Sequence, residues 1–199
     1  HLIFGLLVSV LIQEFFRVLL FLLLKRAERG LELVAEGSAV LASTHRHARA
    51  LVCGFGFGIM SGAFALVNLL RDMAGPGTVG ILGDSPHFFL SSAAMTLAMI
   101  FLHTAWGLIA FDGLEEQRKY LPAGVLLAHF MVSSMTFLNS LDPPLYAVSL
   151  AVAYAMLLVS ALIAFWLSGG SVRRLLYVLS HFKIKGLFRI PTSTALRGS

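Results

Sequence analysis

Charged residues are scarce in this sequence, and cysteine is almost absent. Asp, Glu, Lys and Arg make up 13% of the 199 residues, about half the share that a soluble domain usually carries. The single cysteine, Cys53, excludes a disulfide within the chain and disfavours a cysteine metal site. It stands in an apolar, glycine-rich run, which favours a small packing residue over a reactive thiol. No nucleotide-binding loop or cofactor motif is present, so we expect no cofactor.

Hydrophobic residues, by contrast, make up 58% of the chain and form five long runs. A helix rises about 1.5 Å per residue, so about 20 apolar residues cross the hydrocarbon core of a membrane. Backbone amides in hydrocarbon need internal partners, so these runs must be helices. The expected spans are residues 2–24, 48–70, 88–111, 120–139 and 145–167. We therefore predict an all-α, polytopic transmembrane helix bundle over residues 1–170, followed by a tail over residues 171–199.

Basic residues fall almost entirely on one side of these spans. Thirteen of the fifteen Lys and Arg residues lie near the connections after the first and third spans or in the tail after the fifth. They are Lys25, Arg26, Arg29, Arg46, Arg49, Arg118, Lys119, Arg173, Arg174, Lys183, Lys185, Arg189 and Arg197. The positive-inside rule places this side and the C-terminal tail in the cytosol. The net charge of +5 is thus explained by membrane topology and lipid contact, and we expect no nucleic-acid partner.

Ionisable side chains inside three spans are the first candidates for function, because burying them in hydrocarbon is costly. Glu14, His103 and His129 fall roughly 13–17 Å from the expected cytosolic boundary. This depth is near the middle of a core about 30 Å thick, so we expect these side chains to share an internal site that Gln13 extends. Arg17 follows Glu14 by three residues and can pair with it on the same helix.

Two interpretations of this polar group stay open. A structural hydrogen-bond network would fix the register of the helices, and we favour this interpretation. Thr104 and Ser133 are further polar residues that could extend the network. A proton or ion pathway would instead make the chain a transporter or channel.

A glycine ladder runs along the second span. Gly54, Gly58 and Gly62 are four residues apart and therefore share one helix face. Without side chains they let another helix approach closely, and such contacts favour packing between membrane helices. The helix received there could be a neighbouring span or a partner subunit, and the spacing does not choose between them.

Catalytic motifs are only approximated in this chain. Residues 80–84 have the wrong spacing for the motif of intramembrane aspartyl proteases, and no aspartate lies deep in a span. Ser61 stands in a sequence one residue too long for the rhomboid-type serine motif. His45 and His47 flank an arginine and lack further ligands nearby, so they disfavour a metal site. We therefore expect a protein that is not an enzyme.

Motifs in several segments occur together in a fixed order. The segments are 9–17, 54–62, 83–86, 102–107, and His129 with 136–139. In this order they resemble the anterior pharynx-defective family, a subunit of gamma-secretase. The similarity runs from the first residues to about Gly170 and fades in the tail.

The resemblance implies a non-catalytic scaffold of an intramembrane protease whose other subunits are presenilin, nicastrin and the presenilin enhancer. Presenilin supplies both catalytic aspartates in that complex, which processes type I membrane proteins in Notch signalling and amyloid precursor processing. The family's glycine ladder supports assembly, and its two membrane histidines are linked to assembly and activity of the complex. The pair matching Gln13 and Glu14 belongs to the same internal cavity. The endoplasmic reticulum, the Golgi and the plasma membrane are the implied locations.

The family has seven spans, with a luminal N-terminus and a cytosolic C-terminus. The five spans found here correspond to its last five, and the orientation from charge agrees with that assignment. The chain begins with His1, and its first run has neither a basic n-region nor a small-residue cleavage site. We therefore expect a fragment of a longer protein and no signal peptide.

Overall fold

Each apolar run folds as a helix in the computed structural model, which describes residues 2–34, 46–74, 87–171, 173 and 177. The helices are α1 (Leu2–Val34), α3 (Arg46–Ala74), α4 (Phe88–Glu115), α5 (Tyr120–Met135), the 3₁₀-helix η1 (Thr136–Ser140) and α6 (Tyr146–Leu167). Five helical segments are long and apolar enough to cross a membrane, with α5 and η1 forming one of them. The described part of the chain contains no strand. The prediction of an all-α, multi-pass membrane protein with five spans is confirmed.

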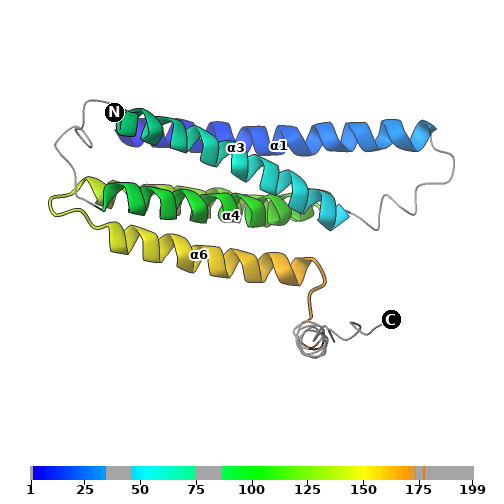
Figure 1. Ribbon diagram of the computed structural model, residues 1–199. Helices are drawn as coiled ribbons and strands as arrows, with labels where there is room; N and C mark the ends of the chain where they lie inside the picture. Colours follow the sequence, from blue (N-terminus) through cyan, green and yellow to red (C-terminus); the bar gives the residue numbers. More distant parts are fainter. Residues whose placement is uncertain (1, 35–45, 75–86, 172, 174–176, 178–199) are drawn as a thin grey trace, which may run out of the picture.

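The long helices lie side by side, and α4 occupies the middle of the bundle (Figure 1). It contributes most of the buried apolar residues, among them Leu102, Trp106 and Phe111. A helix that is apolar all round is typical of a bundle interior, and α4 packs against α3, α5 and α6. The central helix is therefore the one against which the other spans are positioned.

Several helices continue beyond the apolar runs from which they were predicted. The polar connection expected from Lys25 onward begins as a continuation of α1, which ends at Val34. The third predicted span ends at residue 111, but Asp112 still lies on α4, which ends at Glu115. A helix satisfies its own backbone hydrogen bonds in water as well as in lipid, and Lys25 pairs with Glu28 one turn later at 3.3 Å. The end of an apolar run therefore does not mark the end of the helix.

The fourth span changes its helix type near its end. α5 stops at Met135, and η1 continues through Ser140. Leu138 then accepts backbone hydrogen bonds from the amides of Leu141 and Leu145, which closes the turn before α6. The predicted tail lies outside the described residues apart from 171, 173 and 177, as do 35–45 and 75–86 with His45 and Asp84.

Candidate functional site

A charged pair on α1 forms the base of the candidate site. Arg17 Nη2 lies 3.1 Å from Glu14 Oε1, one helical turn earlier. The arginine is only 2% exposed, although α1 leaves many of its apolar side chains on the outside of the bundle. Charged side chains inside a membrane are expected to face the bundle interior and to be paired. Both conditions hold for this pair.

Arg17 also reaches across to α4. Its Nη2 lies 2.8 Å from His103 Nδ1, and its Nη1 donates a 3.5 Å hydrogen bond to the carbonyl oxygen of the same histidine. A guanidinium group only donates hydrogen bonds, so His103 Nδ1 must accept. The imidazole is therefore neutral in this contact, and its proton resides on Nε2.

The third member of the site comes from α5. His129 Nδ1 lies 2.7 Å from Glu14 Oε1. An ionised carboxylate only accepts, so Nδ1 carries the proton in this contact. The same carboxylate oxygen faces both Arg17 and His129. The rings of His103 and His129 meet edge to face with their centres 5.0 Å apart. The structure thus brings Glu14, Arg17, His103 and His129 into one contact group, which we call the polar centre.

Trp106 extends the polar centre to α6. Its ring lies 5.1 Å from that of His129 and 5.6 Å from that of His103, measured between centres. Its indole N–H donates a 3.1 Å hydrogen bond to Ser160 Oγ on α6. Sequence reasoning missed Trp106 and Ser160, because a tryptophan and a serine in an apolar span give no periodic signal that distinguishes a buried polar contact from ordinary packing.

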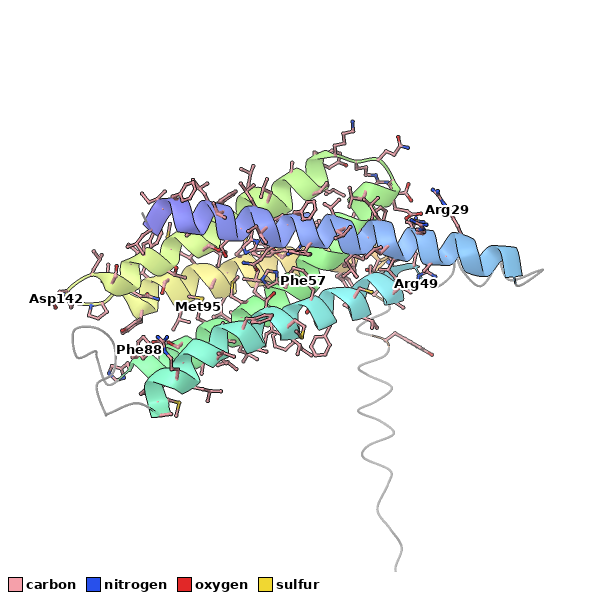
Figure 2. All side chains as sticks on the ribbon, turned by 90° about the horizontal axis from the view of Figure 1, so that it is seen from above. Arg29, Arg49, Phe57, Phe88, Met95 and Asp142 are labelled. Atoms are coloured by element: carbon pink, nitrogen blue, oxygen red, sulfur yellow. The ribbon has the colours of Figure 1, made fainter. Side chains whose placement is uncertain are left out.

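Phe57 brings α3 to the same place. The guanidinium carbon of Arg17 lies 5.2 Å from the centre of the Phe57 ring and 6.0 Å from that of Trp106. Both distances are typical of cation–π contacts. Arg17 Nε is buried and has no hydrogen-bond partner among the described residues, so these ring faces are part of its compensation. Figure 2 shows Phe57 midway along the bundle, between residues that mark its two ends.

Gln13 does not share these contacts. Its side-chain amide donates to Ser9 Oγ at 3.2 Å, one turn earlier on α1. Together with Ser133, Gln13 lines a cavity of about 560 Å³ between α1, α4 and the fourth span. Thr104, expected as a second extension of the centre, donates instead to Ile100 O on its own helix at 2.8 Å. The polar centre is thus smaller than the sequence suggested, and a mostly apolar cavity that includes Gln13 and Ser133 lies beside it.

The glycine ladder is covered by α4 of the same chain. A Cβ atom on Gly54 would lie 2.7 Å from Thr104 O, and one on Gly62 would lie 2.8 Å from Ile100 Cδ1. At Gly58 the added atom would collide with the backbone carbonyl oxygen of Ile100. Of the two occupants that the spacing left open, the structure has the neighbouring span. A direct contact between this face and a partner subunit does not fit the structure.

The chemistry available to the polar centre is that of a closed ion-pair network. One acid and one arginine balance each other, and the imidazoles use their Nδ1 atoms for Arg17 and Glu14. No group of three His, Cys, Asp or Glu side chains in the described part of the chain could hold a metal ion. The arrangement connects α1 with α4 and α5 at one level of the bundle.

Comparison with known proteins gives a consistent result. A family model described as Aph-1 protein matches residues 1–171. The putative gamma-secretase subunit APH-1C of Mus musculus is 48% identical over 178 residues, which cover 89% of this chain and 67% of the relative. Gamma-secretase subunit APH-1B of Homo sapiens is 48% identical over 174 residues (87% and 65%). Gamma-secretase subunit Aph-1 of Drosophila melanogaster is 42% identical over 171 residues (85% and 70%).

The chain spans about two thirds of the length of the relatives that it matches. Their names describe subunits of gamma-secretase and lend no support to a transporter or channel. The family match runs from the first span through the last, across every helix that contributes to the polar centre. The chain belongs to the Aph-1 family.

Proposed function

We propose that this chain is a non-catalytic scaffold subunit of gamma-secretase. Its partners in that assembly are presenilin, nicastrin and the presenilin enhancer, and it supports the intramembrane proteolysis of type I membrane proteins. The observation that carries the proposal is the family match over residues 1–171, with relatives named as gamma-secretase subunits.

The polar centre supports a structural rather than a catalytic role. Arg17 cannot act as a proton acceptor, because a guanidinium stays protonated in proteins. It occupies His103 Nδ1, while Glu14 occupies His129 Nδ1. A general base needs a nitrogen that faces a reactant, and both imidazoles are enclosed by the bundle, with only 1% of each residue exposed.

Scaffolding follows from the way in which α1 is held. Many large apolar side chains on α1 are exposed, including Phe4, Leu11 and Phe15. Lipid gives no hydrophobic driving force for holding such a helix against its neighbours, so hydrogen bonds and close packing must do so. The polar centre therefore fixes the rotation and depth of α1, and with them the apolar surface that α1 presents to another subunit.

The proposal includes the orientation and the location of the protein. The positive-inside rule places the C-terminal tail in the cytosol. The N-terminal end of α1 then faces the lumen or the cell exterior. We place the protein in the endoplasmic reticulum, the Golgi and the plasma membrane, where the assembled protease would meet its substrates.

The test uses cells from which the endogenous Aph-1 subunits have been removed. Tagged protein carrying this chain is expected to co-purify with presenilin and nicastrin from mild detergent and to restore cleavage of a Notch-derived substrate. The purified chain alone is expected to cleave nothing. Cleavage by the isolated chain, or recovery of the tagged protein from these cells with neither presenilin nor nicastrin bound, would contradict the proposal.

A further inference from the structure

One buried carboxylate lies outside the polar centre and has an incomplete set of partners. The Asp112 side chain, near the end of α4, is only 4% exposed. Its Oδ1 lies 3.3 Å from His47 Nε2 and 4.0 Å from Arg46 Nη2. Its Oδ2 is buried and accepts no hydrogen bond from any described residue. Buried polar atoms nearly always have a partner, so a donor from outside the described residues is expected at this oxygen.

Asp112 lines a small cavity between the ends of α1, α3 and α4. The cavity has a volume of about 40 Å³, enough for roughly three water-sized groups. Phe21, Leu24 and Phe111 form an apolar wall, and the rings of Phe21 and Phe111 meet with their centres 5.4 Å apart. The space suits the small polar end of a ligand but not a further helix.

Charges of both signs surround this cavity in equal number. Besides the imidazole of His47, its lining has three ammonium or guanidinium side chains, Lys25, Arg46 and Arg49, and three acidic ones, Glu28, Asp112 and Glu115. A lining whose charges cancel is complementary to a zwitterion rather than to an anion.

The basic groups at the mouth remain partly accessible. Lys25 pairs with Glu115 and Glu28, and its side chain is 31% exposed. Arg46 pairs with Glu116 at 2.5 Å, and its side chain is 40% exposed. Ammonium and guanidinium groups have more donors than one carboxylate uses, so both side chains can also bind a phosphate.

The cavity lies where lipid headgroups are found. Figure 2 places Arg49 at one end of the bundle together with Arg29, opposite Asp142 and Phe88. This is the end that the distribution of basic residues assigns to the cytosol. An apolar wall on one side and charged groups on the other match the boundary between acyl chains and headgroups.

We propose that this cavity binds the headgroup of phosphatidylethanolamine from the surrounding leaflet. The primary ammonium donates to Asp112 Oδ2, and the phosphate accepts from Arg46 and Lys25. A quaternary ammonium has no N–H to donate, so phosphatidylcholine cannot satisfy Asp112. Phosphatidylserine carries a further carboxylate, which a neutral lining does not favour.

Native mass spectrometry of the purified protein tests this assignment. The protein is titrated with phosphatidylethanolamine, phosphatidylcholine or phosphatidylserine of identical acyl chains. We expect phosphatidylethanolamine to bind about tenfold more tightly than phosphatidylcholine, the factor that one charge-assisted hydrogen bond supplies. Equal binding of these two lipids, as expected if Asp112 faces only water, would overturn the proposal. Binding of phosphatidylserine as tight as that of phosphatidylethanolamine would also overturn it.

Variants separate the cavity from general lipid adhesion. Asp112→Asn keeps the shape of the side chain and is expected to abolish the preference for phosphatidylethanolamine. Arg46→Gln is a second cavity variant, which serves if Asp112→Asn does not fold. It changes an exposed side chain, so we expect the protein to stay folded. It is expected to weaken phosphatidylethanolamine binding several-fold by removing a phosphate donor. Asp142→Asn, the same chemical change at the opposite end of the bundle, should leave the preference intact. A preference that survives both cavity variants would contradict the assignment.

Discussion

Two contacts within this bundle hold helices together by different means. α3 meets α4 through backbone atoms, because Gly54 and Gly58 have no side chain that would separate the two helices. α1 meets α4 and α5 through a charged pair and two imidazoles. Neither contact depends on a hydrophobic driving force, which lipid does not provide between helices. The first depends on shape and the second on charge balance, so they should fail under different substitutions.

Substitutions that upset the charge balance of the polar centre should have the largest effect on the free energy of unfolding. Glu14→Gln leaves the Arg17 charge facing a neutral His103, with no acid in the group to balance it. We expect a loss of about 3–5 kcal/mol in the free energy of unfolding, the range for breaking a buried ion pair. The measurement is reversible unfolding of the purified protein in bicelles.

Arg17→Gln is the matched control for that variant. It leaves Glu14 hydrogen-bonded to His129 at 2.7 Å, so the remaining carboxylate keeps a partner inside the bundle. Its cost should therefore be clearly smaller than that of Glu14→Gln. Equal costs, or the reverse order, would show that charge balance does not govern this contact.

Shape should govern the contact between α3 and α4. Gly58→Leu places a side chain against the backbone carbonyl of Ile100, and overpacking of this kind costs about 1–3 kcal/mol. Gly56 lies on the same helix, and a Cβ atom added there would meet no atom within 4 Å. Gly56→Leu should leave the unfolding free energy nearly unchanged. If both leucines destabilise the protein equally, the close contact between the glycine ladder and α4 does not determine the loss of stability.

Removing the hydrogen bond between Trp106 and Ser160 on α6 should have an intermediate effect on stability. Trp106→Phe keeps the ring near His129 but removes the indole N–H that Ser160 accepts at 3.1 Å. One lost hydrogen bond costs about 1 kcal/mol. Ser160→Ala should cost a similar amount, and the double variant should cost little more than either single one. Additive losses in thermal unfolding would argue against a shared hydrogen bond.

The smallest effect on stability is expected for the exposed ion pair of Arg46 and Glu116. The Arg46 guanidinium hydrogen-bonds Glu116 and holds the pKa of that carboxyl below its usual value. A lowered pKa in the folded state stabilises the protein at pH values above the pKa of the unfolded state, and this contribution disappears as the pH falls through the folded value. Glu116→Gln should therefore be slightly less stable than the parent at pH 7 and indistinguishable from it in strong acid. A difference in stability between the variant and the parent that grows as the pH falls would contradict this prediction.

The sequence predicts the spans well and their ends poorly. Long apolar runs leave only helices as an option in lipid, so the five spans follow from hydropathy alone. The first predicted span ends at residue 24, whereas the helix continues to Val34, because α-helix formation does not require an apolar environment. Asp112 illustrates the same limit, since it follows the predicted span 88–111 directly, yet it lies on the helix and its side chain is buried.

The candidate site could be predicted in part for a similar reason. Depth along each helix follows from residue number, so Glu14, His103 and His129 could be placed at one level. Rotation about the helix axis does not follow from residue number alone. The sequence therefore did not show that Trp106 packs against both histidines, or that Gln13 lines a neighbouring cavity.

We propose that the polar centre fixes α1 so that other subunits can bind. A double-variant cycle on assembly tests it most directly, using co-purification of presenilin and nicastrin with Glu14→Gln, Arg17→Gln and the double variant. We expect the double variant, which is again neutral, to recover more presenilin and nicastrin than Glu14→Gln alone. Recovery equal to the product of the two single effects, or parental recovery in all three variants, would contradict it.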